Sequence, residues 1–294
     1  MPKIKILHLE SAMGFGGQQI RILNKIRALR EKNYWITLGA FPKSEIFKKA
    51  CQMKLKVYPL PLKKKDLKGI FAGQLINYNK FNSKKIVSIP TGVDLAAFDP
   101  KKVKSGLLSP NGFNIGMISI FLEWKGHTYF ILAAKEILKE IPHAEFYIAG
   151  NGNKKAQERI EKQIQDLNLQ NKVHLLGFRE DIPQILASLD VLVHPSYASE
   201  GLPQVILQAL AMGKPVITTN IGSICEVIKH KKTGLIIPLK DPQAIAEAVL
   251  KLYKNPELRK KLSEKGRKLI EENYSFNKMI DKIEKIYYCS LNRI

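Results

Sequence analysis

The sequence contains few cysteines and no long apolar run. Its three cysteines, Cys51, Cys225 and Cys289, are far apart in the chain, so they indicate neither a disulfide framework nor a zinc site. No run approaches the roughly 18 apolar residues that a membrane-spanning helix needs. The first ten residues, MPKIKILHLE, have too short an apolar core for a signal peptide. These absences predict a protein of the reducing cytoplasm.

Arginine is also scarce, although the chain of 294 residues has a formal net charge of +22. Only 8 of the 48 basic residues are Arg, and because base-edge and two-point phosphate contacts favour Arg, no nucleic-acid partner is expected. Residues 1–100 contain 19 Lys or Arg against 6 Asp or Glu. Part of this excess forms an N-terminal basic patch, interleaved with apolar residues: Lys54, Lys56, Lys63, Lys64, Lys65 and Lys68. The patch suits an anionic membrane surface, where the protein would be peripheral, or an ordinary lysine-rich surface.

Strand-like apolar runs alternate with amphipathic helical stretches in the first part of the chain, which is typical of parallel α/β layers. Strands are predicted over residues 4–9, 34–40 and 57–60, and helices over residues 18–32 and 44–54. The alternation is lost over residues 63–83. The string KKIVSIPTGVD then predicts one more strand that runs into a turn, and residues 95–112, with two prolines, predict a linker.

From residue 113 onward the alternation is complete, which predicts a whole doubly wound domain with its ligand crevice at the carboxyl ends of the strands. The predicted strands are 113–120, 145–149, 173–176, 191–194, 216–218 and 235–237. The predicted helices are 126–140, 154–168, 182–188, 203–213 and 242–254, followed by two more between residues 256 and 291.

The segment SYASEGLPQVILQALAMGKPV, residues 196–216, carries the clearest chemical pattern. Pro203 fits the first turn of a helix, and the main-chain N–H groups from Gly201 to Gln204 could face an anion at the positive end of the helix dipole. Glu200, just ahead of them, could accept hydrogen bonds from hydroxyl groups. Gln208 lies about two turns into the same helix. Phosphate and hydroxyl recognition together predict a nucleotide-sugar ligand.

This segment resembles the signature of the family four glycosyltransferases, retaining enzymes of GT-B fold, in which two Glu are separated by seven residues that begin with Gly, any residue and Pro. The second Glu, which meets the nucleotide ribose in that family, is Gln208 in this chain. Glutamine still accepts a hydrogen bond but has no charge. The alternative is an ordinary strand, loop and helix whose Glu is solvated.

Further positions match the family. Lys125 and Gly126, in EWKGH, correspond to the Lys-Gly pair whose ammonium meets the donor diphosphate, although residues 119–123 lack the Arg that usually accompanies it. Phe178 and Arg179, in GFRED, occupy a strand end whose backbone contacts the base in the family. An ion pair of Arg179 with Glu180 or Asp181 is the plainer interpretation.

Glycines mark two other expected contacts. Gly150, in IAGNGN, ends a strand and allows a ligand close to the backbone, or simply forms a turn. In MGFGGQQ, Gly16, Gly17 and Gln18 match the loop that contacts the donor sugar or its phosphate in the family. His194 is interpreted as a packed residue at a strand end, without a role.

The resemblance implies a GT-B-like α/β fold with two Rossmann-type domains of parallel sheets, the N-terminal one truncated. An abbreviated acceptor-side domain is expected over residues 1–92, with an irregular stretch near 69–73 that suggests an excision. A hinge over residues 93–112 and a nucleotide-sugar-binding domain over residues 113–273 follow. Residues 274–294 are expected to form a helix that crosses back to the first domain. A sheet cut short exposes an edge, so self-association through the N-terminal part is expected.

The implied activity is glycosyl transfer with retention from a nucleoside-diphosphate sugar to a lipid-linked or saccharide acceptor, in cell-surface polysaccharide or lipopolysaccharide synthesis. The chain has no Asp-x-Asp, so neither a metal nor a cofactor beyond the donor substrate is expected. A non-catalytic nucleotide-sugar-binding module, or half of a complex, is the alternative. The expected catalytic residues are Glu200 and Lys125. The expected donor-binding residues are Gly16, Gly17, Gln18, Gly150, Phe178, Arg179, Gly201, Leu202, Pro203, Gln204 and Gln208.

Overall fold

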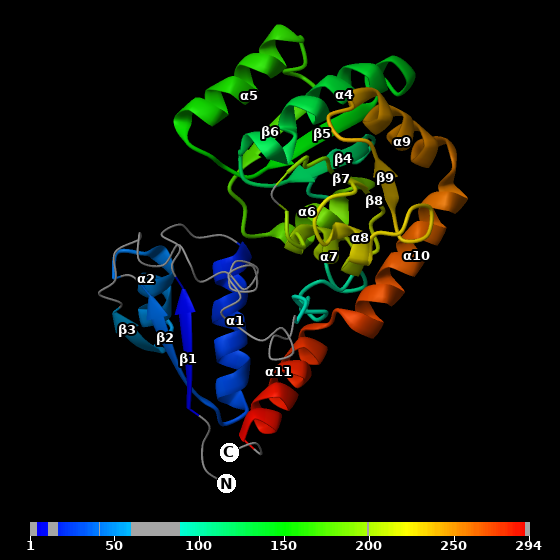
Figure 1. The fold of residues 1–294 in the computed structure, drawn as a ribbon. Coiled ribbons are helices and arrows are strands. Elements are labelled where there is room, and N and C mark those ends of the chain that lie inside the picture. Colours follow the sequence, from blue (N-terminus) through cyan, green and yellow to red (C-terminus); the bar gives the residue numbers. More distant parts are fainter. Residues whose placement is uncertain (1–4, 11–16, 41, 60–88, 199, 292–294) are drawn as a thin grey trace, which may run out of the picture. The chain divides into compact units, whose positions relative to one another are not determined.

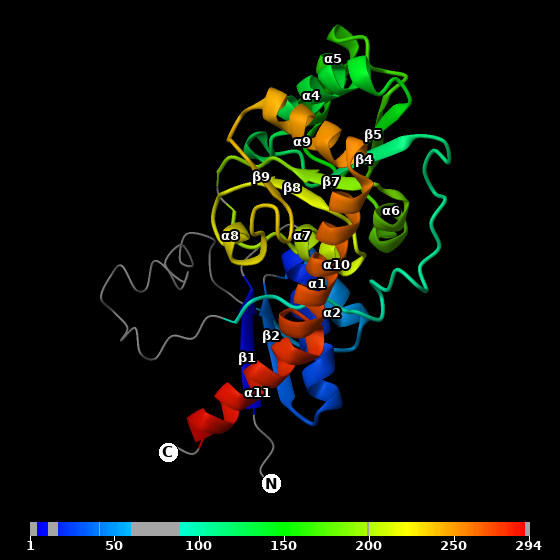
Figure 2. The same cartoon turned by 90° about the vertical axis from the view of Figure 1, so that its right-hand side faces the viewer.

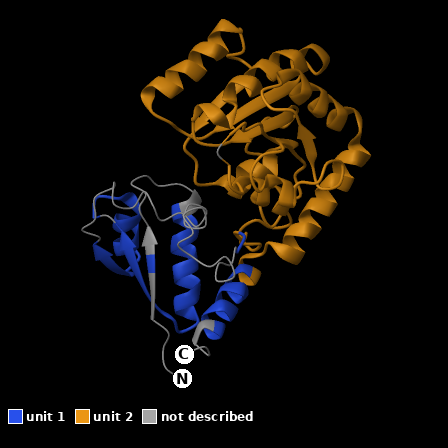
Figure 3. Ribbon diagram, viewed as in Figure 1, with its two compact units in different colours: residues 1–90, 279–294 blue, residues 91–278 orange. Residues whose placement is uncertain are grey.

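The computed structural model describes residues 5–10, 17–40, 42–59, 89–198 and 200–291. It divides into two compact units, unit 1 with residues 1–90 and 279–294, and unit 2 with residues 91–278 (Figure 3). Lys63 to Lys68 and the irregular stretch near residues 69–73 lie outside the described residues. The stretch expected as a hinge, residues 93–112, belongs to unit 2, where Val93, Phe98 and Leu108 are buried.

Unit 1 is built on a parallel three-stranded sheet in the order β1-β2-β3. Its strands are β1 (Lys5–Glu10), β2 (Trp35–Ala40) and β3 (Lys56–Pro59), and its helices are α1 (Gly17–Glu31) and α2 (Glu45–Gln52). Ser44 begins α2 because its hydroxyl accepts a hydrogen bond from the N–H of Phe47. Each of these elements lies within two residues of its predicted bounds. The strand predicted at the start of KKIVSIPTGVD lies outside the described residues, and in the turn that follows Val93 makes an isolated bridge to Ser275.

Helix α11 (Phe276–Leu291) spans the boundary, and its residues from Met279 onward belong to unit 1. There Lys32 forms ion pairs with Asp281, at 3.4 Å, and with Glu284. The rings of Tyr34 and Tyr287 pack at 5.9 Å between centroids. The first and last parts of the described chain therefore fold together. Among the helices that the structure describes, none is long and apolar enough to cross a membrane.

Unit 2 contains a parallel six-stranded sheet in the order β6-β5-β4-β7-β8-β9 (Figure 1). The strands are β4 (Phe113–Ile118), β5 (Ala144–Ala149), β6 (Val173–Gly177), β7 (Val191–His194), β8 (Val216–Thr219) and β9 (Leu235–Ile237). The chain builds outward from β4 to β6, then returns to the other side of β4 with β7. The order reverses between β4 and β7, which is the place where such sheets bind ligands.

Helices cover both faces of this sheet (Figures 1 and 2). One apolar core includes residues of α4 (His127–Glu140), α5 (Lys154–Asp166) and α9 (Pro242–Lys254). The other includes residues of α6 (Ile182–Ser188), α7 (Gln204–Ala211), α8 (Ile224–Val227) and α10 (Pro256–Asn273). All four residues of β7 are buried, which explains why the strand is apolar throughout.

Side-chain caps fix where several of these helices begin. Asp241 accepts a hydrogen bond from the N–H of Ala244 at the start of α9, and Asn255 accepts one from Leu258 at the start of α10. A proline follows each cap, at the first helical position, where its missing N–H is not needed. Local sequence thus determines the two helices that connect the sheet to the end of unit 2.

Candidate active site

The loops that follow β4 and β7 meet at the point where the strand order reverses. After β4 the chain makes a short 3-10 helix, η3 (Glu123–Lys125), and turns through Gly126 into α4. Gly126 has a φ of +84°, and a Cβ atom built on it would lie 2.3 Å from the carbonyl oxygen of Pro195. The N–H of Tyr197 donates to the carbonyl of Trp124 at 2.8 Å. The two loops therefore form one packed structure, which requires glycine at position 126.

Glu200 and Lys125 come together in this structure. The Nζ atom of Lys125 lies 2.5 Å from Oε1 of Glu200, and the two side chains are only 14% and 6% exposed. Ser196 donates its hydroxyl to the same oxygen at 2.6 Å, and Nε2 of His194 lies 3.2 Å from it. The sequence predicts Lys125 and Glu200 as the catalytic residues, and the structure brings both to the switch point as a buried ion pair. Glu200 is thus not the solvated loop residue of the alternative interpretation.

These contacts determine the protonation of the cluster that Lys125, Glu200, Ser196 and His194 form. Burial alone would raise the pKa of Glu200, but the hydrogen bonds from His194, Lys125 and Ser196 outweigh it and lower the pKa to about 2. Burial lowers the pKa of His194, against the effect of Glu200. At neutral pH, Glu200 is therefore a carboxylate and His194 a neutral ring. Because Nε2 of His194 also lies 3.1 Å from the Ser196 hydroxyl, the tautomer with its proton on Nε2 fits both contacts.

One side of the Glu200 carboxylate is left for a ligand. The contacts with Lys125, Ser196 and His194 all use Oε1, and no described residue donates a hydrogen bond to Oε2. The main-chain N–H groups of Gly201 and Leu202 also take no part in the hydrogen bonds of the described residues. A Cβ atom built on Gly201 would meet nothing within 4 Å. An acceptor oxygen and free N–H donors thus lie next to each other beside open space.

The start of α7 differs from the sequence prediction in two respects. The helix begins at Gln204, and Pro203 precedes it as the N-cap in extended conformation, so Pro203 is not in the first turn. The side chain of Gln204 is engaged, because it accepts a hydrogen bond from Thr91 at 2.7 Å and donates to the carbonyl of Gly92 at 3.1 Å. Gln204 therefore holds the segment that enters unit 2, and only its main-chain N–H remains for a ligand. Gln208 is half-buried on the same helix.

The structure describes the surroundings of three other residues that are predicted to contact the donor. A Cβ atom at Gly150 would lie 1.9 Å from the carbonyl oxygen of Ser119, so this glycine permits close packing of two loops. Arg179 forms two hydrogen bonds with Asp181, at 2.8 and 2.5 Å, as the plainer interpretation predicts. Phe178 follows β6 and is 52% exposed. Their contacts with a donor remain predictions.

In unit 1, Gly16 lies outside the described residues, whereas Gly17 begins α1 and Gln18 lies in its first turn. In unit 2, sequence reasoning missed two members of the cluster, Ser196 and His194. His194 ends the buried strand β7, and Ser196 follows it by two residues in the loop that leads to Glu200. That spacing of a histidine, a hydroxyl and a carboxylate was the available signal.

A parallel six-stranded sheet whose strand order reverses between β4 and β7, with helices on both faces, is the architecture of a Rossmann-type unit. The sequence model of the family Glycosyl transferases group 1 matches residues 99–269, and the chain belongs to that family. Solved structures also match across both units. A glycosyltransferase from Rickettsia africae ESF-5 superposes with a TM-score of 0.82 and 20% identity, covering 98% of each chain. The GT-B-like fold with two units of parallel sheet, predicted from the sequence, is confirmed.

Two of the similar proteins have names or titles that state a ligand or a reaction. Anabaena Alr3699/HepE, solved in complex with UDP and glucose, has a TM-score of 0.82 at 18% identity, covering 97% of this chain and 99% of its own. The UDP-Gal:alpha-D-GlcNAc-diphosphoundecaprenol alpha-1,3-galactosyltransferase of Escherichia coli is 35% identical over 211 residues, which is 69% of this chain and 54% of that protein. The chain spans about half the length of the curated relatives it matches.

Proposed function

We propose that the protein is a retaining glycosyltransferase that moves a sugar from a nucleoside-diphosphate sugar to a lipid-linked or saccharide acceptor, in the synthesis of a cell-surface polysaccharide or lipopolysaccharide. The observation that carries the proposal is the buried Lys125–Glu200 pair at the switch point between β4 and β7. Family membership supports it. The Escherichia coli relative, whose name states a lipid-linked acceptor, supports that acceptor class.

Two kinds of protein group would contact the donor. The ammonium of Lys125 and the N–H groups of Gly201 and Leu202 would hold the diphosphate and stabilise the charge that develops on it as the sugar leaves. Oε2 of Glu200 would accept hydrogen bonds from hydroxyl groups of the sugar. When the donor binds, Lys125 would share its charge between the Glu200 carboxylate and the diphosphate. Glu200, with a pKa of about 2, is a poor proton acceptor, and Nδ1 of His194 is buried, which fits a reaction in which the donor phosphate itself takes the acceptor proton.

The donor assignment is tested by the Lys125→Met variant. Loss of one charged hydrogen bond is expected to weaken UDP binding by about 1.5–3 kcal/mol, and UMP binding by less, because UMP lacks the second phosphate. Isothermal titration with both nucleotides measures the difference. Lys139→Met is the matched control, since Lys139 is 63% exposed and pairs with Glu136 on the surface of α4.

Equal losses for UDP and UMP would contradict a diphosphate contact at Lys125. A thermal-shift screen of nucleotide-sugars then identifies the donor, because a ligand raises stability in proportion to ln(1 + [L]/Kd). Hydrolysis and transfer assays with that donor separate an enzyme from a binding module. Tight binding without turnover would support the module.

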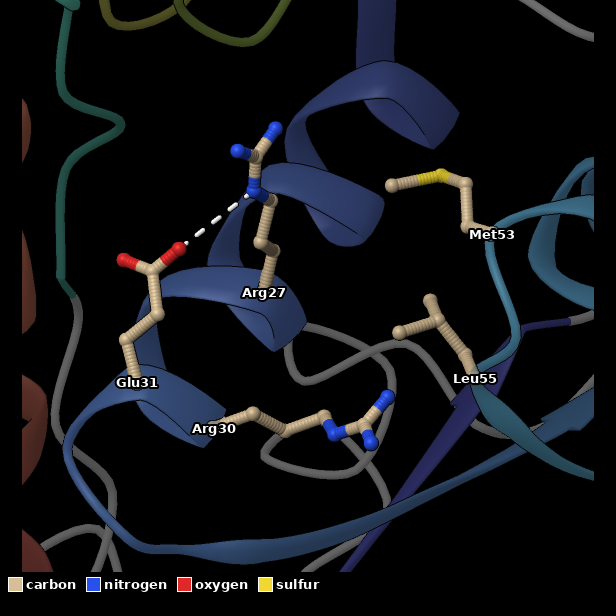
Figure 4. A pocket seen from close by; sticks show the side chains of 5 residues that line it. All are labelled: Arg27, Arg30, Glu31, Met53 and Leu55. Atoms are coloured by element: carbon tan, nitrogen blue, oxygen red, sulfur yellow. Dashed lines mark hydrogen bonds and ion pairs between the residues drawn. The ribbon is translucent and has the colours of Figure 1, made fainter.

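Peripheral membrane binding through the N-terminal basic patch is part of the proposal. In its described part, Lys54 and Lys56 are exposed and Tyr58 is 60% exposed. A neighbouring open cavity of about 510 Å³ is lined by apolar and charged side chains (Figure 4): Arg27, Arg30, Glu31, Met53 and Leu55. Basic and apolar groups on one surface suit anionic headgroups, with each basic residue contributing about 1 kcal/mol near the membrane.

Vesicle sedimentation tests the membrane surface. The protein is expected to sediment with anionic vesicles at low salt and to be released at high salt. Replacing Lys63, Lys64 and Lys65 with Gln should reduce this binding severalfold. Replacing three exposed lysines of α10, Lys260, Lys261 and Lys265, removes the same charge and should not. Equal losses in both variants would indicate net charge alone. Self-association through unit 1 stays a prediction, for which sedimentation equilibrium is the measurement.

A further inference from the structure

Two buried threonines of β8 extend its attachment to β7 beyond the end of the strand pair. The main-chain pairing of the two strands ends at His194 and Thr218. The Thr218 hydroxyl donates to the carbonyl of His194 at 2.9 Å, and the Thr219 hydroxyl donates to the carbonyl of Ser196. All four side chains are at most 1% exposed. Side chains of β8 therefore hold the chain that leaves β7 before it reaches Glu200.

The direction of the hydrogen bonds between His194, Ser196 and Glu200 is determined. Nδ1 of His194 is buried and has no partner among the described residues, so a proton there would be an unsatisfied donor. With the proton on Nε2, the ring donates to the Ser196 hydroxyl at 3.1 Å and to Glu200 at 3.2 Å. The single hydroxyl proton of Ser196 then goes to Oε1 of Glu200, at 2.6 Å. Ser196 thus accepts from His194 and donates to Glu200.

These bonds restrict how Lys125 can meet the Glu200 carboxylate. An ammonium is a compact charge with three donors, and by itself it is attracted to both oxygens of a carboxylate. In the structure Lys125 contacts Oε1, the oxygen that also accepts from Ser196 and His194. Without the Ser196 hydroxyl, the carboxylate would be free to turn until Lys125 contacts both oxygens. Ser196 therefore keeps Oε2 available.

The threonines of β8 are not explained by packing alone. The strand begins with Val216 and Ile217, which are fully buried like the two threonines that follow. Valine has nearly the shape of threonine and has no hydroxyl that loses its hydration on burial. The Thr219 hydroxyl is satisfied by Ser196, the residue that holds Glu200. This placement connects β8 to the geometry of the site.

We propose that Ser196 is a positioning residue for Glu200, and that Thr219 of β8 acts through Ser196. Ser196 holds Oε1 beside Lys125, so that Oε2 is presented to the sugar of a nucleotide-sugar donor. The contact with the sugar rests on the proposed function. The orientation of the carboxylate in the empty site does not.

A crystal structure of the full-chain Ser196→Ala variant without ligand tests the orientation directly. The Glu200 carboxylate is expected to turn until both of its oxygens contact Nζ of Lys125. Ser196→Cys is the second variant, because a thiol fills the space but is a weak donor. The same turn in both variants would show that the hydroxyl proton holds the carboxylate. A turn in the alanine variant alone would assign the effect to packing, and an unchanged carboxylate in both would exclude any effect. Either result would overturn the proposal.

Binding of UDP-glucose and of UDP separates positioning from general support of the site. Lys125 and the main-chain N–H groups would hold the diphosphate of both ligands, whereas Glu200 would meet only the sugar. Ser196→Ala is expected to reduce the preference for UDP-glucose over UDP about tenfold, which is the loss of one charged hydrogen bond. The affinity for UDP itself should change much less. Equal losses for the two ligands, measured by titration calorimetry, would overturn the proposal.

Thr219→Val extends the test to β8 with little change in side-chain shape. It should lower the preference for UDP-glucose severalfold. Thr233→Val is the matched control, because the Thr233 hydroxyl also donates to a main-chain carbonyl of unit 2, that of Val227 at 2.7 Å. The control should lower the melting temperature and leave the preference unchanged. A wild-type preference in Thr219→Val would overturn the role of β8.

The two ideas can fail separately. If wild-type protein binds UDP-glucose no more tightly than UDP, the sugar contact of the proposed function is contradicted, and the crystal structures of the Ser196 variants still decide whether Ser196 orients Glu200. If the carboxylate does not turn, Ser196 is not a positioning residue, even where a nucleotide-sugar binds and reacts.

Discussion

Replacing Glu200 with Gln is expected to destabilise unit 2 and to reduce transfer in the same variant. The change keeps the shape of the side chain but leaves Lys125, which is only 14% exposed, without its counter-charge. Breaking a buried pair in this way costs about 3–5 kcal/mol. For a unit of this size that is a fall in melting temperature of roughly 6–20 °C. Calorimetry measures the fall, and transfer should drop at least about tenfold through loss of one charged contact to the sugar.

Two variants make this result specific to the buried pair. Glu136→Gln removes the carboxylate of an exposed pair with Lys139 at 2.6 Å, and should cost less than about 1 kcal/mol. The double variant Lys125→Met, Glu200→Gln should recover part of the lost stability, because no unpaired charge remains, yet recover no transfer. A single Glu200→Gln variant with wild-type stability and turnover would rule out the assignment of Glu200.

Gly222→Ala is expected to disrupt the same site from a distance in sequence. Gly222 has a φ of +53°, and a Cβ atom there would lie 2.0 Å from the carbonyl oxygen of Glu200. The left-handed backbone would cost the alanine roughly 1–3 kcal/mol, and displacing the Glu200 main chain a similar amount. Differential scanning calorimetry should therefore show a lower melting temperature, and UDP affinity should fall with it.

Gly201→Ala is the matched control for the glycine effect. Its Cβ atom meets no atom within 4 Å, and its backbone is not left-handed. The melting temperature should stay unchanged while donor binding weakens, because a methyl group would occupy the space beside the free N–H groups. If Gly222→Ala were as stable as Gly201→Ala, the close contact between residue 222 and Glu200 would not exist in solution.

The fold of unit 2 was largely predictable because its signals are local. Strands β7 and β9 and helices α6 and α9 have the bounds expected from sequence. Apolar runs mark buried strands, and cap residues such as Asp241 mark helix starts. The end of β4 was predicted two residues too late, since the apolar Ile120 follows Ser119 and extends the strand-like run, whereas both residues belong to the loop after β4. Where the strand ends and the loop begins depends on tertiary contacts, which the local sequence does not reveal.

The candidate site was predicted in part. Lys125 and Glu200 could be predicted because each lies in a separate motif of the family, and the strand order explains why they meet. Sequence reasoning treated Gln204 as a ligand-facing residue, whereas its side chain binds Thr91 and Gly92, 113 and 112 positions away in sequence. His194 was predicted as a packed residue without a role, because a histidine after an apolar run does not reveal which carboxylate it faces. Contacts between residues that are distant in sequence could not be predicted.

Unit 1 is formed by two segments that are far apart in the chain, and this has a consequence for the order in which the two units fold. The unit combines residues 1–90 with residues 279–294, and Lys32 pairs there with Asp281 and Glu284. A ribosome releases residues 91–278, which form unit 2, before the part of α11 from Met279 onward that completes unit 1. We therefore expect unit 2 to fold first, and unit 1 to be completed only when α11 is available. Limited proteolysis of stalled nascent chains would record this order.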